Sequence, residues 1–177
     1  MEFLNPKIIN PRIFYFIYLQ KRLRVLVTLL RQFAIARVWQ KFLPMTKIEH
    51  IGIAVANLEN ASLIYEKLFG APAYKQEEVA SEGVKTAFFR SGPNKIELLE
   101  GTNPESPITK FIAKKGEGIH HIAFDVEDII MEIARLKNEG FVILNETPKK
   151  GADNKWVAFL HPKSTNGVLI ELCQEMP

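Results

Sequence analysis

The sequence has a single cysteine, Cys173, among its 177 residues. One thiol cannot form an internal disulfide, and it cannot supply the cysteine pairs of a zinc ribbon. A disulfide-stabilised fold is therefore excluded, and with 47% hydrophobic residues the chain can instead bury a sizeable core. A reducing compartment is the simplest home for such a chain, so we expect it in the cytoplasm.

Long apolar runs and glycine-rich phosphate loops are also missing. The two apolar stretches near the N-terminus, 13–19 and 25–30, are separated by basic residues. Neither reaches the ~18 uncharged residues that a membrane span needs. No glycine-rich loop of the type that cradles ATP phosphates occurs, which argues against ATP chemistry.

Acidic residues are almost absent from residues 1–44, which hold eight basic residues and only Glu2 as an acid. Residues 45–177 hold the other 15 basic and 19 acidic residues, so they offer no basic face to nucleic acid. We interpret 1–44 as an extension outside the domain, with translation starting at Met45. A helix lying on an anionic membrane is one alternative. A targeting segment is the other, although the stretch lacks the serines of a transit peptide.

Residues 45–177 contain an internal repeat with a spacing of 71. Residues 48–55 (IEHIGIAV) match residues 119–126 (IHHIAFDV), so that His50 aligns with His121. Both segments alternate in part and are rich in β-branched residues, which predicts strands. Each is followed by a helical pattern, at 58–69 and 126–137, and a glycine, Gly70 or Gly140, follows as the stop signal.

Three further strand-like runs follow each predicted helix. They lie at 74–79, 84–90 and 95–100 in the first half, and at 141–145, 156–160 and 168–173 in the second. Each half is therefore predicted as a βαβββ module, over about 46–101 and 119–174, with a linker at 102–118. We expect an α+β domain over 45–177, in which the two modules form a curved, eight-stranded mixed sheet with pseudo-twofold symmetry and a concave face.

Two histidines and two glutamates occupy matching strands of this repeat. His50 and His121 lie on the first strand of each half, and Glu97 and Glu171 lie on the fourth, 47 and 50 residues further on. One such histidine alone is usually a core residue. Four residues in matching places indicate a divalent metal on the concave face, because imidazoles and carboxylates suit such ions. Strand alternation directs His120 away from this site.

Three segments carry a family resemblance: 118–126 (GIHHIAFDV), 145–155 (NETPKKGADNK) and 159–174 (FLHPKSTNGVLIELCQ). With the first strand, they resemble the vicinal oxygen chelate superfamily, and within it the methylmalonyl-CoA epimerases, over about 46–174. The resemblance implies two paired βαβββ modules, one divalent metal ion per chain, and epimerisation at C2 of methylmalonyl-CoA. It also implies the metal ligands, which would be His50, Glu97, His121 and Glu171; some members have glutamine in place of Glu97.

The expected reaction interconverts the R and S epimers through an enolate. A 2-methylmalonyl thioester can chelate a metal through its carboxylate and thioester carbonyl oxygens, which stabilises the charge left when the C2 proton departs. We expect Glu171 to serve one face of C2 and Glu97, as a partly released ligand, the other. In several family members an acid on the third strand serves one face, but Thr86 stands there in this chain. A water held by Thr86, or Glu82 reaching inward, are the alternatives.

The remaining expectations concern the partners. Lys150 and Lys163, with Lys149 and Lys155, can contact the phosphates of a coenzyme A thioester as flexible point charges. His161 begins a turn, HPK, and is expected to cap it. The metal can be cobalt, manganese, zinc or nickel, and we expect a homodimer.

Two other functions fit the same residues. Glyoxalase I, or another lyase of the superfamily, can use the same ligand set and also moves a proton, through an enediolate. A non-catalytic protein that sequesters a small molecule is a further alternative, but such a binder has no need of four metal ligands. The HPK turn and the linker sequence 104–107 (PESP) favour the epimerase.

Overall fold

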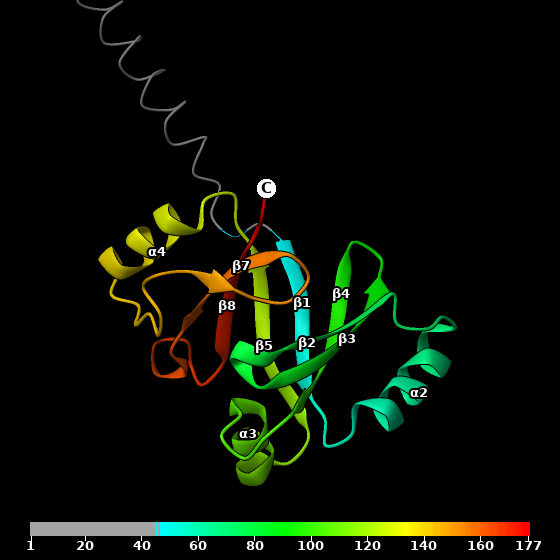
Figure 1. Ribbon diagram of the computed structural model, residues 1–177. Helices are drawn as coiled ribbons and strands as arrows, with labels where there is room; N and C mark the ends of the chain where they lie inside the picture. The colour runs from blue at the N-terminus through cyan, green and yellow to red at the C-terminus, as the bar shows by residue number, and fades with distance from the viewer. Residues whose placement is uncertain (1–44, 46) are drawn as a thin grey trace, which may run out of the picture. The chain divides into compact units, whose positions relative to one another are not determined.

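The fold comes from a computed structural model of the chain, which describes residue 45 and residues 47–177. The predicted extension, 1–44, lies outside the described residues. The described residues form one eight-stranded sheet with the order β2-β3-β4-β1-β5-β8-β7-β6 (Figure 1). Its strands are β1 (Lys47–Ala54), β2 (Lys75–Val79), β3 (Val84–Ser91), β4 (Asn94–Gly101), β5 (Gly118–Asp125), β6 (Lys149–Lys150), β7 (Lys155–Leu160) and β8 (Leu169–Glu175).

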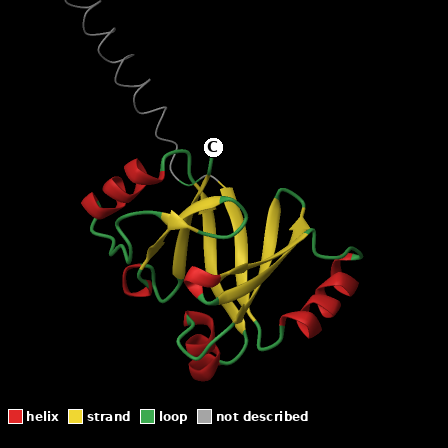
Figure 2. Cartoon of the chain, in the orientation of Figure 1, coloured by secondary structure: helices red, strands yellow, loops and turns green. Residues whose placement is uncertain are grey.

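Three helices and two short 3-10 turns complete the described fold (Figure 2). They are α2 (Leu58–Phe69), α3 (Pro107–Lys115), α4 (Ile129–Asn138), η1 (Ala80–Glu82) and η2 (Pro162–Ser164). The Asn57 and Asp128 side chains cap α2 and α4 by accepting from backbone N–H groups three residues on. Gly70 ends α2 with φ at 69°, as the sequence predicts. Among residues 47–177, no helix is long and apolar enough to cross a membrane.

The two halves meet in the middle of the sheet. β1 pairs antiparallel with β5, its repeat partner, while β4 pairs parallel with β1 and β8 pairs parallel with β5. The four central strands are therefore β4, β1, β5 and β8, and each half contributes two of them. The predicted α+β fold, with two βαβββ modules in one mixed sheet, is confirmed.

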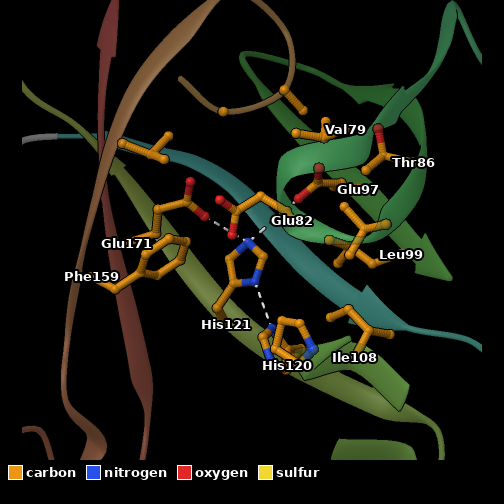
Figure 3. Close-up of a pocket in the computed structure, with 15 residues that line it drawn as sticks. Val79, Glu82, Thr86, Glu97, Leu99, Ile108, His120, His121, Phe159 and Glu171 are labelled. Carbon is orange, nitrogen blue, oxygen red and sulfur yellow. Dashed lines mark hydrogen bonds and ion pairs between the residues drawn. The ribbon is translucent and has the colours of Figure 1, made fainter. Parts of the chain in front are cut away.

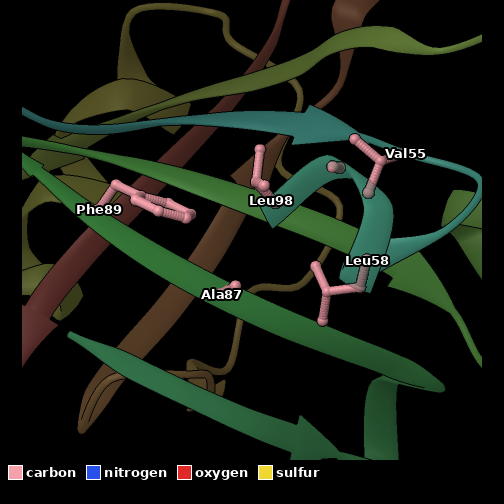
Figure 4. Packing of buried hydrophobic residues seen from close by; sticks show 6 residues of the cluster. Val55, Leu58, Ala87, Phe89 and Leu98 are labelled. Carbon is pink, nitrogen blue, oxygen red and sulfur yellow. The ribbon is translucent and has the colours of Figure 1, made fainter. Parts of the chain in front are cut away.

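Side-chain alternation separates a hydrophobic outer face, covered by α2 and α4, from a concave inner face that carries the predicted ligands. Ala87 and Phe89 of β3 and Leu98 of β4 pack with Leu58 of α2 (Figure 4). The residues between them, including Thr86 and Glu97, therefore point to the opposite, concave side. In the second half α4 covers the equivalent outer surface, formed by Ala158, Leu160 and Leu172. Because α2 and α4 lie on the outer face, they do not cover the predicted ligands on the concave face.

The strand predicted over 141–145 is wrong. The structure has a single bridge there, between Ile143 and Leu160, and only the two-residue β6 follows. The Asn145 side chain explains this, since it accepts from the Phe159 backbone N–H at 2.9 Å and donates to the Val157 carbonyl at 3.2 Å. Backbone hydrogen bonds from Leu144 to Phe159 and from His161 to Val142 pair the segment with the end of β7, and the Asn145 side chain interrupts the ladder beyond them.

Candidate active site

The four predicted metal ligands come together at the seam between the two halves. The Nε2 atoms of His50 and His121 are 2.9 Å apart. Glu97 Oε2 lies 3.2 Å from the Nε2 of His50 and 3.4 Å from that of His121. Glu171 Oε2 lies 3.5 Å and 2.9 Å from the same two atoms. All four residues are buried, and each half supplies one imidazole and one carboxylate.

These distances fit a shared divalent ion. Bonds of ~2.0–2.2 Å to one ion hold neighbouring ligand atoms ~2.9–3.5 Å apart, with the shorter value for octahedral and the longer for tetrahedral angles. The five separations between these atoms fall in this range, and His50, His121 and Glu171 form a group that could hold an ion, with Glu97 beside both histidines. Two imidazoles and two carboxylates are also a normal ligand set for a metal of intermediate hardness. The residues present therefore fit the metal that the resemblance implies.

The electrostatics of the cluster are strongly coupled. Burial opposes every charge here, yet the attraction between the groups is larger. The imidazoles lower the pKa of Glu97 and Glu171 below the usual range of a glutamate. The carboxylates in turn raise the pKa of His50 and His121. Imidazoles and carboxylates thus stabilise each other's charged forms, and a bound cation would stabilise the ionised carboxylates in the same way.

Gly52 allows the His121 ring to lie against the neighbouring strand. Gly52 of β1 is paired with His121 of β5. A Cβ atom at Gly52 would stand 2.2 Å from the His121 ring, far inside van der Waals contact. Any side chain at position 52 would displace the His121 ring, so the glycine has a direct role in the geometry of the cluster.

Each ligand histidine is preceded by a β-bulge. In the β1–β5 ladder, Glu49 and His120 are skipped by the pairing. A bulge turns two consecutive side chains toward one side of the sheet, whereas regular alternation would separate them. Glu49 therefore contacts His50, with its Oε2 atom 2.5 Å from Nδ1. The prediction that His120 points away is wrong, because its Nδ1 lies 3.0 Å from the Nδ1 of His121.

Sequence reasoning missed Glu49 and His120. A signal was present, because both stand at the same place of the repeat and make a polar pair in an otherwise apolar strand. Burial opposes ionisation of Glu49, but hydrogen bonds from His50 and Lys95 lower its pKa to about 2. Burial and the nearby His121 lower the pKa of His120 to about 4, so that its ring is neutral at pH 7.

Three of the four predicted ligands, Glu97, His121 and Glu171, line a pocket that we call the central pocket (Figure 3). Its walls are largely apolar, with Val84, Leu99, Ile108, Val157 and Phe159 among the lining residues. Thr86 also lines it, 1% exposed, and its hydroxyl has no hydrogen-bond partner among the described residues. A buried hydroxyl without a partner is costly, so its position in a pocket indicates that a ligand or water completes it.

Glu82 also lines the central pocket, as the sequence allows, but its carboxylate is engaged. Lys149 of β6 binds it at 2.6 Å and so links η1 of the first half to the second half. The Glu82 carboxylate is therefore paired across the pocket.

The four predicted lysine contacts divide into two pairs. Lys155 is buried between Glu49 and Glu175, whereas Lys149 is ion-paired with Glu82 but has a side chain that is 41% exposed. The prediction for Lys155 is wrong, because its side chain is buried. The sequence alone does not show that this side chain points inward. Lys150 and Lys163 are exposed. His161 caps its turn as expected, accepting from the Lys163 backbone N–H at 3.0 Å.

A second group that could hold an ion, Glu49, His50 and Cys173, lies on the other side of the His50 ring. Its His50 nitrogen is Nδ1, which already binds Glu49. Burial, reinforced by the charge of Glu171, raises the pKa of the Cys173 thiol well above its usual value. A thiol kept protonated is a poor metal ligand. The Nε2 side of the two histidines is therefore the better metal centre.

Comparison with known proteins decides the family. The model of the glyoxalase/bleomycin resistance protein/dioxygenase superfamily matches residues 49–159, which include most of the repeat and three of the four predicted ligands. The chain belongs to this superfamily. It is the vicinal oxygen chelate superfamily that the sequence motifs resemble, so the resemblance is confirmed.

Several similar members of the superfamily are named epimerases. The mitochondrial methylmalonyl-CoA epimerase of Dictyostelium discoideum is 42% identical over 71% of this chain and 76% of its own length. The ethylmalonyl-CoA/methylmalonyl-CoA epimerase of Cereibacter sphaeroides is 42% identical over 72% and 97%. A solved structure of Streptomyces coelicolor methylmalonyl-CoA epimerase with 2-nitronate-propionyl-CoA is 33% identical, with a TM-score of 0.71 over 75% and 96%. These likenesses make the chain an isomerase of the epimerase class.

Proposed function

We propose that this superfamily member interconverts the R and S epimers of methylmalonyl-CoA at C2, with a divalent metal held by His50, Glu97, His121 and Glu171. The observation that carries the proposal is the convergence of these four side chains, two from each repeat, at a largely apolar pocket that Glu97, His121 and Glu171 line. The names of the similar proteins support the same substrate. Glyoxalase I could use the same ligands, but these relatives favour the epimerase.

A divalent ion in this position, of cobalt, manganese, zinc or nickel, would polarise the substrate's carboxylate and thioester oxygens and stabilise the charge that develops when the C2 proton leaves. The two histidines and two glutamates would hold the ion at the place where these substrate oxygens bind. The apolar walls at Leu99, Val157 and Phe159 exclude water around the reacting carbon, which strengthens the electrostatic interactions there.

The two glutamates are arranged to serve opposite faces of C2. Glu97 belongs to β4 and Glu171 to β8, which flank the central β1–β5 pair on opposite sides. A substrate lying over the two histidines therefore has one carboxylate on each side. We propose that Glu171 removes or returns the proton on one face and that Glu97 does so on the other.

The coenzyme A part of the bound substrate is expected to extend out of the central pocket past β6. Gly151 and Ala152 line the central pocket, and the exposed Lys150 directly precedes them. We propose that Lys150, and Lys163 of η2, contact the phosphates as point charges. The side chains of Lys150 and Lys163 are exposed and can reach a phosphate, whereas that of Lys155 is buried.

Exchange at C2 tests the function. Methylmalonyl-CoA incubated with the protein in deuterated water should lose its C2 proton signal in NMR spectra, and chelation of the metal should stop the exchange until a divalent ion is returned. The hemithioacetal of methylglyoxal and glutathione serves as the parallel substrate. Conversion of the hemithioacetal alone would identify a glyoxalase, and turnover of neither compound would favour the non-catalytic binder.

Thr86→Val is expected to separate activity from stability. The change keeps the side-chain shape but removes the hydroxyl that lacks a partner. We propose that this hydroxyl donates to the substrate's carboxylate, so kcat/KM should fall by ~5–10-fold, the value of about one hydrogen bond. The melting temperature should stay the same or rise, because an unsatisfied buried group is lost. Unchanged kinetics would mean that Thr86 does not touch the substrate.

We also propose that residues 45–177 are sufficient for folding and activity, as a cytoplasmic homodimer. A chain that starts at Met45 should match the full chain in turnover and melting temperature, because all four ligands and the described hydrophobic clusters lie within it. Light scattering on both chains gives the oligomeric state. A large loss of turnover on truncation would assign residues 1–44 a part in the site instead.

A further inference from the structure

Glu49 touches one specific nitrogen of a proposed metal ligand. Its carboxylate lies 2.5 Å from His50 Nδ1, while His50 Nε2 faces Glu97 and Glu171. An ionised carboxylate has no proton and can act only as a hydrogen-bond acceptor. His50 Nδ1 must therefore carry the proton and donate it to Glu49. The contact therefore selects the form of the ring in which Nε2 is the ligand atom.

Glu49 is itself fixed from both halves of the molecule. It is 3% exposed and binds Lys95 of β4, and Lys155 of β7 lies at 3.5 Å. Lys95 also binds Asp153, at 2.7 Å, in the loop between β6 and β7. With two lysines around it, the carboxylate cannot turn away from His50 without losing its charge partners.

The backbone is distorted at Glu49, and this also indicates a role. The bulge in β1 leaves Glu49 out of the ladder with β5, and it directs the carboxylate toward the His50 ring. The second half repeats the device, since the bulge at His120 brings that ring to Nδ1 of His121. Two independent strands thus place a polar partner on the same ring nitrogen of each ligand histidine.

We propose that Glu49 is a positioning residue that orients His50 for metal binding through its Nδ1–H. This inference rests on the proposed metal site. A hydrogen bond from the outer nitrogen to a carboxylate fixes the ring and makes the ligand nitrogen more basic, and removal of such a partner typically costs ~10–100-fold in metal affinity.

Two variants test how much the contact between Glu49 and His50 contributes to metal affinity. Glu49→Leu removes the acceptor, and Glu49→Gln keeps an oxygen but loses the charge. Both should fold, because Lys95 retains Asp153 and Lys155 retains Glu175. The matched control is Glu132→Gln, another buried glutamate, which is ion-paired with Arg135 on α4. Titration calorimetry with Zn²⁺ should give affinities ~10–100-fold weaker for Glu49→Leu, intermediate for Glu49→Gln and unchanged for the control.

NMR of ¹⁵N-histidine-labelled protein supplies a readout that does not depend on activity. His50 should show a slowly exchanging, downfield Nδ1–H proton, with and without zinc, and Glu49→Leu should lose it. Wild-type affinity in both Glu49 variants, or a His50 proton on Nε2 in the zinc-loaded protein, would overturn the proposal. If wild-type protein bound no metal, the proposed centre would fail, yet the Nδ1–H resonance in the metal-free protein would still test the Glu49 contact.

Discussion

Replacing both His50 and His121 with alanine is expected to remove the bound metal and with it the epimerase activity. These residues supply both nitrogen atoms of the four-residue cluster, and their Nε2 atoms are only 2.9 Å apart. Even the loss of an outer hydrogen-bond partner can cost ~10–100-fold in affinity, so the loss of a direct ligand should cost at least that. Elemental analysis of the purified variant, together with turnover of methylmalonyl-CoA, measures both effects.

The fold should survive this double substitution. The hydrophobic clusters under α2 and α4 lie on the outer face of the sheet and share no residue with the ligand set. Circular dichroism should therefore match that of the wild type. His161→Ala is the matched control, because His161 caps a surface turn and should leave the metal content unchanged. A stoichiometric divalent ion that persisted in the double variant would end the metal hypothesis.

Glu171→Gln should keep the metal but lose epimerisation by ~10²–10⁴-fold, the usual effect of removing a positioned general base. Glutamine keeps the size of the side chain and an oxygen ligand at the site of Glu171 Oε2, 2.9 Å from His121 Nε2. It cannot accept the C2 proton at neutral pH. Full metal content with lost turnover would separate the role of Glu171 as a base from its role as a ligand.

Because Glu97 and Glu171 are proposed to serve opposite faces of C2, the two variants should differ in which epimer they affect. If each carboxylate serves one face, Glu171→Gln should abolish deuterium exchange from one epimer, and exchange from the other should continue without inversion. Glu97→Gln should show the opposite preference. Pure R and pure S substrates, followed separately by NMR, distinguish these cases. Loss of the same hand in both variants would mean that the second base is not Glu97.

Much of this site could be predicted from the sequence because the signals are local. The repeat aligns His50 with His121, and the strand that ends each repeat carries Glu97 or Glu171. Helix α2 is found at the predicted residues, since its apolar periodicity and its final glycine are features of the segment itself.

The features that sequence reasoning missed depend on how strands pair. The bulges at Glu49 and His120 arise from the register between β1 and β5, which no single segment specifies. Lys155 looks like any exposed lysine of a loop until the fold brings Glu49 beside it. The false strand at 141–145 has the apolar pattern of a real one, but its backbone pairs with the end of β7 only around Ile143, and the Asn145 side chain interrupts the ladder beyond it.

The proposed ligands are divided equally between the two halves, so the site forms only when the halves are brought together. One half alone holds one imidazole and one carboxylate, so it would have to find a second half in solution before it could hold an ion. The linker that carries α3 makes this encounter intramolecular, and a short tether of this type gives an effective concentration on the order of millimolar. An ion bound across the β1–β5 seam then acts as a cross-link between the halves. The two modules should consequently separate less readily during unfolding when the metal is present.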